Sequence, residues 1–429
     1  MSVATRPVGP TVPLVFTTER AAIVLVVLVW LRLMANLVVL SFTADKHFVA
    51  VGEAEPSSHL ADLAGRLFLA LALGWAAAVI IYRINELPRV GLWRITVFLA
   101  PWLVLLLRDA YDGHVGASAV PLLFIVAALA ALRPGRPTLE ALGVLVIITA
   151  LIALVWGVAF PEAAILREAD GTVRESAKAL LPHLGLLQGQ FTSENNLAQY
   201  LALGLPFVLL VRPRWFAALG VVACAIALVW TSSRGGLLTA GVVGVLALVL
   251  YAVRSWPAAV AWCSGLALLA AATVCVWLPL HSWSDEAFTA RAGIWRISTQ
   301  EWFTNADLFG FGSQWFETMA RNATSSLNAA AYHGHNQFVQ FGVTGGVLLV
   351  VVGACWLLAL GLVSLRPSAP EQRTAGLVLV AIVVSGFFEV PLGFVDRWSF
   401  WAVTLVPLAI LLFGPPRRSA TPLDAWRRP

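Results

Sequence analysis

A short polar run, Tyr332-His333-Gly334-His335-Asn336-Gln337, ends directly at an apolar segment that contains Gly342, Gly345 and Gly346. A histidine can accept a proton near neutral pH, so His335 could activate a hydroxyl nucleophile as a general base, with Asn336 in support. A lone histidine is more often structural. Its asparagine neighbour and its position at the mouth of a glycine-rich helix favour a catalytic role.

Three arginines lie in other polar segments. Arg234 belongs to the turn Thr231-Ser232-Ser233-Arg234-Gly235-Gly236, where two glycines would form a hinge that lets the backbone approach a ligand. Arg291 and Arg296 belong to Arg291-Ala-Gly-Ile-Trp295-Arg296, which is followed by Gly310-Phe-Gly312 and Trp315. Guanidinium groups suit phosphate and diphosphate recognition. The alternatives are a snorkelling arginine at a helix end for Arg234 and a solvated helix face for Arg296.

The elements that must position these residues are membrane-spanning helices. The chain is 59% hydrophobic and 12% charged, with a mean hydropathy of +0.84, whereas soluble domains carry about twice that charge fraction. Residues 141–161, 215–233, 235–253 and 255–284 each lack an ionised side chain and are each long enough to span a bilayer. This composition excludes a soluble protein and predicts an all-α polytopic membrane protein. The four cysteines lie in apolar runs, so we expect neither a disulfide nor a metal site.

We predict a single transmembrane domain over residues 1–429 with about twelve transmembrane helices. They lie near residues 20–42, 66–82, 93–107, 117–132, 140–159, 196–211, 215–231, 235–253, 257–280, 337–365, 374–391 and 397–414. Loops rich in basic residues stay in the cytoplasm, and the arginines are concentrated in one set of loops. Both termini are therefore expected in the cytoplasm. The basic isoelectric point near 9.3 then reflects anchoring beside anionic membrane lipids and not a nucleic-acid partner.

The same topology places two long segments outside the plasma (inner) membrane. These are residues 160–195 and residues 281–336, the latter between the ninth and tenth helices, and both are expected to carry function. The stretch from Asp285 to Phe303 alternates apolar and charged residues, which predicts helices on the outer membrane surface. Arg234, Arg291, Arg296 and His335 all fall on this outer side.

Two further sets of polar residues carry weaker hypotheses. Arg32, with Asn36 one turn later, lies inside the first span, where a charge is costly and usually faces a cavity or a partner. Glu389, Asp396 and Arg397 surround the last outward turn and could contact sugar hydroxyls or pair among themselves.

The order of these motifs resembles the O-antigen ligase and polymerase superfamily. The resemblance is carried by Ser-Arg-Gly-Gly at 233–236, Arg291 with Trp295, Gly310-Phe-Gly312, His335-Asn336, and Phe191-Thr-Ser-Glu-Asn195-Asn196-Leu-Ala-Gln-Tyr200 leading into a segment with Pro206. It implies an inverting GT-C glycosyltransferase that moves a glycan from a polyprenyl-diphosphate carrier to a hydroxyl of a glycan or lipid acceptor, with no cofactor or metal. It also implies His335 as the base, Arg234 and Arg291 as diphosphate ligands with Arg296 beside them, and Asn336, Asn196 and Ser233 in support.

Other functions stay open at this stage. Ligation onto an acceptor and polymerisation of repeat units use the same donor chemistry, so these residues do not separate them. A secondary transporter would carry charges near mid-membrane and inverted repeats, whereas only Arg32 lies deep. A non-catalytic scaffold or flippase partner would tolerate loss of His335.

Overall fold

The computed structural model describes residues 17–44, 46–48, 56–87, 91–306, 308–321, 332–367, 371–395 and 398–414. These residues form helices joined by irregular segments, with only two isolated β-bridges, so the predicted all-α class is confirmed. The α-helices are α1 (Thr18–Thr43), α2 (His59–Arg83), α4 (Leu92–Tyr111), α5 (Val120–Leu132), α6 (Arg136–Ala159), α7 (Pro161–Ala164), α8 (Glu194–Val208), α9 (Arg214–Thr231), α10 (Arg234–Ala252), α11 (Pro257–Leu280), α12 (Ala287–Asn305), α13 (Trp315–Arg321), α14 (Gln337–Ser364), α15 (Gln372–Ser385) and α16 (Leu405–Phe413).

Every segment predicted to span the membrane contains helix, and seven of the described helices are long and apolar enough to cross a bilayer. They are α1, α2, α6, α9, α10, α11 and α14. Helices α5 and α15 are apolar but shorter, and the last predicted span is divided into a 3-10 segment, Trp398–Val403, and α16. The structure thus supports a polytopic membrane protein, while the count of twelve stays a prediction.

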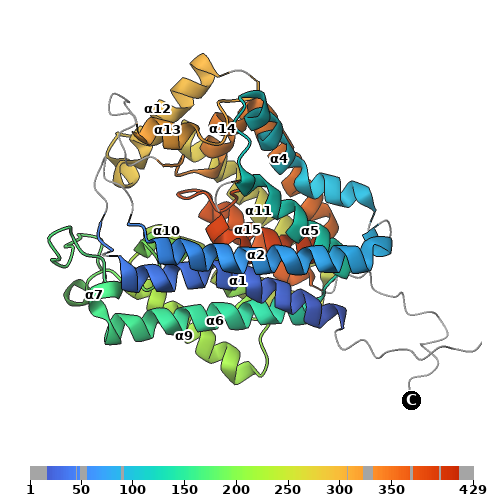
Figure 1. The fold of residues 1–429 in the computed structure, drawn as a ribbon, viewed down its shortest axis with the longest axis horizontal. Helices are drawn as coiled ribbons and strands as arrows, with labels where there is room; N and C mark the ends of the chain where they lie inside the picture. The colour runs from blue at the N-terminus through green and yellow to red at the C-terminus, as the bar shows by residue number, and fades with distance from the viewer. Residues whose placement is uncertain are drawn as a thin grey trace, which may run out of the picture.

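The helices form a bundle in which α1, α2 and α6 run side by side, and α12 and α13 gather toward one end (Figure 1). At the opposite end, the Glu19 carboxylate at the start of α1 accepts hydrogen bonds from Gly135 N and Thr138 Oγ1 near the start of α6. Gly414, after α16, lies against Pro134 there. The start of α1 and the end of α16 therefore share one end of the bundle.

Helix α14 is broken at Gly346, whose φ of 65° and ψ of −164° are accessible essentially to glycine alone. The break frees carbonyl groups, and the segment after α12 fills it: Phe311 N donates to Val343 O at 2.8 Å and Gly312 N to Thr344 O at 2.9 Å. Helix α4 holds the same segment, because Arg108 Nε donates to Gly310 O at 2.8 Å. The Gly310-Phe-Gly312 motif therefore completes a membrane helix.

The segment 160–193, between α6 and α8, folds back against the ends of several helices. Leu187 N donates to Trp230 O at the end of α9, at 3.2 Å. Lys46, beyond the end of α1, is buried and its Nζ donates to Gly189 O at 2.8 Å and Phe191 O at 3.1 Å. Burial lowers the pKa of Lys46 to about 7.

Candidate active site

Asn336 joins α14, α11 and the segment after α15 at the end of the bundle that carries α12. It caps α14, because its Oδ1 accepts from Phe338 N and Val339 N at 2.9 and 3.1 Å. Its Nδ2 donates to Cys275 O of α11 at 3.0 Å, a carbonyl left without its helical partner because Pro279 has no N–H. The same amide donates to Phe387 O at 3.2 Å. Asn336 is wholly buried and its support to the site is structural.

Gln337 fixes the chain that follows α15. Its backbone N–H donates to Gly386 O at 2.8 Å, and its side chain exchanges two hydrogen bonds with the backbone of Leu392, at 2.9 and 3.3 Å. The segment between these two anchors carries Glu389. The start of α14 therefore determines where this carboxylate lies.

Glu389 lies between an arginine and two histidines. Its Oε1 is 2.6 Å from Nη2 of Arg291, and its Oε2 is 3.8 Å from Nε2 of His333 and 4.0 Å from Nδ1 of His335. The carboxylate and both imidazoles are largely buried, with side-chain exposures of 11% for Glu389, 12% for His333 and 18% for His335. Arg291 and His335 are thus brought together by a carboxylate that lies 98 residues from Arg291 in the chain.

The two imidazoles have distinct hydrogen-bonding states. Their ring centroids are 3.9 Å apart, and His335 N donates to Nδ1 of His333 at 3.1 Å, which leaves Nε2 of a neutral His333 carrying the proton toward Glu389. His335 has a left-handed backbone with φ of 46°, and its carbonyl accepts from Trp295 Nε1 at 3.2 Å. Nδ1 of His335 is buried and forms no hydrogen bond with the described residues, and the Glu389 carboxylate lies 4.0 Å from it.

Arg234 lies at the first position of α10, where it is exposed and forms no ion pair with any residue that the structure describes. Ser233 caps this helix and donates from Oγ to Asn195 Oδ1 at 2.8 Å. The next residue, Gly235, faces Phe388, whose ring packs on Trp295 and lies 6.0 Å from the Arg291 guanidinium. A helix start with an exposed guanidinium attracts anions, and here it borders the Arg291 cluster.

The expected two-glycine hinge after Arg234 is wrong. Both glycines belong to α10, and a Cβ at Gly236 would lie 2.5 Å from Ala198 Cβ. Gly236 therefore lets α10 pack closely on α8, and the backbone there does not serve as a flexible approach to a ligand.

The structure adds a cation that the sequence did not single out. Lys178, in the segment between α7 and α8, forms an ion pair with the buried Glu194, which accepts a hydrogen bond from Asn195 Nδ2 at 3.1 Å. Asn195 in turn accepts from Ser233. The predicted supporting residue Asn196 lies beside them and donates its backbone N–H to Ser193 Oγ at 3.2 Å. The segment before α8 thus reaches the start of α10. The feature of the sequence that could have pointed to Lys178 is its residue type, because lysine is rare in this arginine-rich chain.

The remaining predicted residues lie in other surroundings. Arg296 forms a two-point ion pair with Asp285 at 2.8 and 2.9 Å, with both side chains more than half exposed, and this bonding lowers the pKa of Asp285. Asp396 and Arg397 lie outside the described residues. Arg32 and Asn36 line a separate cavity of about 500 Å³ between α1 and α2. Trp295 is buried in the site, while Trp315 stacks on Phe311 beside α14.

His333, His335 and Glu389 also have the composition of a metal site. One ligand atom from each lies within 4.8 Å of the others, and two histidines with a carboxylate suit zinc. The Arg291 guanidinium at 2.6 Å already compensates the carboxylate charge and disfavours a second cation there. The absence of a metal requirement stays a prediction, which metal removal can test.

The fold and this cluster define a polytopic helical membrane protein with a polar site at one end of its bundle. Residues 219–354 match the family model described as O-antigen ligase, which confirms the resemblance to the O-antigen ligase and polymerase superfamily and supports glycan transfer of that general kind. The matched segment contains Arg234, Arg291 and His335 and ends before Glu389. No curated protein is significantly similar to the chain.

Proposed function

We propose that this protein transfers a glycan from a polyprenyl-diphosphate carrier to an acceptor hydroxyl on the outer face of the plasma membrane. The observation that supports this function best is the convergence of Arg291, Glu389 and His335 at one end of the bundle. This cluster combines a cation for a diphosphate with an imidazole for a hydroxyl, which are the two groups that the reaction needs.

In the proposed reaction, the imidazole of His335 accepts the proton of the acceptor hydroxyl while that oxygen attacks the anomeric carbon. The bond between this carbon and the diphosphate oxygen breaks, and its electron pair leaves with the diphosphate, so that the configuration inverts. Glu389, 4.0 Å from Nδ1, stabilises the imidazolium that forms. A general base of this kind contributes about a hundredfold to ten-thousandfold in rate.

The cations of the site stabilise the leaving diphosphate. Arg291 has donors beyond the one used by Glu389, and the exposed Arg234 lies at the positive end of α10. Preorganised donors act where charge develops, and removing one costs about a hundredfold to a thousandfold in rate.

The test compares His335→Ala with His183→Ala in cells that lack the native gene. His183 is exposed on the outward segment 160–195 and is bonded to no part of the cluster, so it controls for loss of a histidine on this side. We expect H335A to insert normally, to lose glycan transfer and to accumulate the lipid-linked donor, while H183A behaves as the native protein. Full transfer by H335A would refute the proposal. In the null strain, lost polymer length would indicate a polymerase and lost attachment a ligase.

A further inference from the structure

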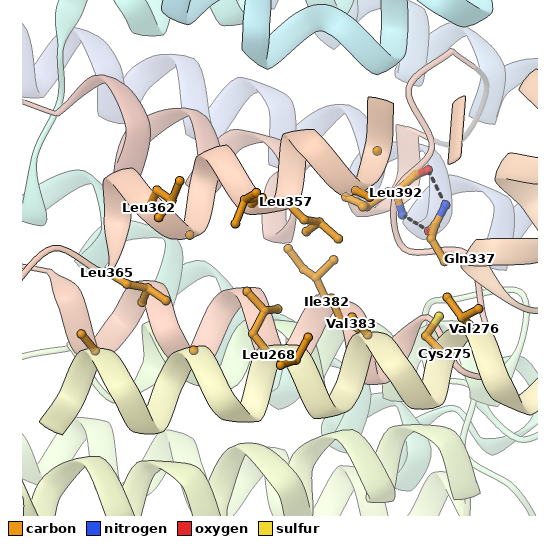
Figure 2. A pocket seen from close by; sticks show the side chains of 18 of the residues that line it. Leu268, Cys275, Val276, Gln337, Leu357, Leu362, Leu365, Ile382, Val383 and Leu392 are labelled. Carbon is orange, nitrogen blue, oxygen red and sulfur yellow. Dashed lines mark hydrogen bonds between the residues drawn. The ribbon is translucent and has the colours of Figure 1, made fainter. Parts of the chain in front are cut away.

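The cavity between α1 and α2 takes no part in the proposed reaction. It has a volume of about 500 Å³ and lies where α1 ends and α2 begins, between two helices that run side by side (Figure 1). Eight of its fifteen lining residues are polar or charged. The groove of about 660 Å³ between α11 and α14 is lined almost entirely by apolar side chains instead (Figure 2). The α1–α2 cavity therefore suits a polar ligand.

Hydrogen bonds between the two helices fix the walls of this cavity. Asn36 Nδ2 of α1 donates to Ala61 O of α2 at 2.9 Å, and the hydroxyl oxygens of Thr43 and Ser58 are 2.6 Å apart at the helix ends. Gly65 lets the helices approach, because a Cβ there would already lie 3.4 Å from Asn36 Cβ. The cavity is thus formed before any ligand enters.

Two guanidinium groups line the cavity inside apolar helices that are long enough to cross a bilayer. Arg32 lies eleven residues before the end of α1 and Arg66 seven residues after the start of α2, so they are about 16 Å and about 10 Å from those ends. Arg66 is exposed and forms no ion pair with any residue that the structure describes. Arg32 has five N–H donors, so it can bind a ligand oxygen beside a protein partner. Cations at this depth are costly unless an anion accompanies them.

The charges of the cavity indicate which anion fits. Arg32, Arg66 and Asp62 are two cations and one anion, so the lining has a net charge of +1, which a single negative charge neutralises. A phosphodiester carries one negative charge, and guanidinium groups match its oxygen atoms. The Asp62 carboxylate and the hydroxyls of Ser57 and Ser58 can bind hydroxyl groups of the ligand. A phosphodiester that carries hydroxyls therefore fits better than one that carries a quaternary ammonium group.

The position of Arg66 favours a lipid over a soluble phosphate. Leu63 and Leu67, on either side of Arg66 along α2, are more than half exposed, as expected for side chains that face lipid. The guanidinium therefore lies at the boundary between the cavity and the surrounding bilayer. A lipid can place its head group in the cavity from this side and leave its acyl chains in the membrane.

We propose that the α1–α2 cavity binds the head group of a phosphatidylglycerol-type lipid, whether or not the protein transfers glycans. The phosphodiester binds Arg32 and Arg66, and the glycerol hydroxyls bind Asp62 and the serines. The ligand also touches Thr192, which lines the cavity directly before Ser193, the cap of α8. Asn195, three residues further along, supports Ser233 at the start of α10. A bound lipid thus contacts the segment that borders the candidate active site.

Native mass spectrometry of the full-length protein in detergent tests this site with dioleoylphosphatidylglycerol as the probe. Arg66→Gln removes a cation of the cavity, and Arg321→Gln is the matched control, because Arg321 is exposed on α13 outside the cavity. We expect R66Q to weaken binding of the first lipid about tenfold, as the loss of one charge-assisted contact does, and R321Q to bind as the native protein does. Equal binding by R66Q and the native protein would overturn the proposal.

Asp62→Asn gives the opposite prediction and serves as the second variant if R66Q does not fold, as judged by size-exclusion chromatography. It raises the net charge of the cavity and keeps an acceptor for hydroxyls, so phosphatidylglycerol should bind at least as tightly. Weaker binding by D62N would contradict the assigned charge of the ligand.

Two competitors identify the source of the phosphodiester. Dioleoylphosphatidylcholine should bind the native protein about tenfold more weakly than phosphatidylglycerol, because its head group carries an extra positive charge and no hydroxyl. Excess glycerol 1-phosphate should leave the lipid bound. Equal binding of the two lipids would exclude a selective head-group site, and displacement by glycerol 1-phosphate would assign the cavity to a soluble phosphate and refute the lipid.

Discussion

Replacing Glu389 with glutamine removes one charge and keeps nearly the same shape. Glu389 is expected to stabilise the imidazolium of His335 during transfer and to compensate Arg291 between turnovers. In E389Q the imidazolium loses its counter-ion, and the uncompensated Arg291 opposes the new positive charge. Both effects slow the chemical step. The freed guanidinium binds the diphosphate at least as well, so the KM for the donor should stay constant or fall.

The distance between the two groups sets the expected magnitude. For unit charges 4.0 Å apart, the Coulomb energy is about 4 kcal/mol at an effective dielectric constant near 20 and about 1 kcal/mol in water. The side chains of His335 and Glu389 are only 18% and 11% exposed, so the larger figure is the better guide. A loss of ~4 kcal/mol corresponds to about a thousandfold in rate. We therefore expect kcat to fall by two to three orders of magnitude.

The assay measures transfer from a polyprenyl-diphosphate-linked glycan by purified protein in nanodiscs, with the donor concentration varied to separate kcat from KM. Glu317→Gln is the matched control, because Glu317 is an exposed carboxylate paired with Arg321 on α13. Glu389→Asp keeps the charge and should recover part of kcat. A kcat for E389Q within threefold of the native value, or a fall explained by a higher donor KM, would refute the proposed role of the carboxylate.

Four further predictions concern other parts of the structure. Arg291→Ala should lower transfer about a hundredfold or more and raise the donor KM, whereas Arg296→Ala, which breaks only an exposed pair with Asp285, should change transfer less than threefold; equal losses in the kinetic assay would contradict this assignment. Transfer should persist in EDTA, because Arg291 already compensates the Glu389 charge; activity that is lost in EDTA and restored by added metal would show that the site is a metal centre. The pKa of Lys46 falls from 10.5 to about 7 on folding, so between these pH values the unfolded chain binds more protons than the folded protein. The free energy of unfolding should therefore rise with pH across this window, by up to about 1.4 kcal/mol per pH unit. Thermal unfolding measured from pH 6 to 9 should show this slope, and Lys46→Met should flatten it. Gly346→Ala should lower stability by about 1–3 kcal/mol or more, because the new Cβ meets Leu308 O at 2.2 Å and the backbone cannot relax; an unchanged melting temperature would argue against the break in α14.

The helices and the grouping of polar motifs at one end could be predicted from the sequence. A long apolar run is stable in a bilayer as a membrane-spanning helix, and the end of one such helix lies on the same side of the membrane as the start of the next. The polar motifs follow this rule, because they lie at the ends of α9 and α15 and at the starts of α10 and α14. The predicted helix over Asp285–Phe303 corresponds to α12, although its first residues, Phe288 to Ala290, adopt a left-handed turn.

The partners within the site could not be predicted in the same way. Glu389 was expected to contact sugars or to pair with Asp396 and Arg397. It pairs instead with Arg291, which depends on how α12 and the segment after α15 lie relative to each other. The role of each glycine could not be predicted either, because a glycine that allows close helix packing and a glycine that breaks a helix look the same in a sequence. Gly236 proved to be the first kind and Gly346 the second.

The position of Glu389 has a consequence for biogenesis. A ribosome that has completed α14 has already made both histidines and all three arginines, but the carboxylate and the segment anchored by Gln337 come only after α15. Until then the imidazole lacks its counter-ion and Asn336 lacks one of its acceptors. The order of synthesis thus delays the pairing of Glu389 with Arg291 and the histidines until the bundle is nearly complete.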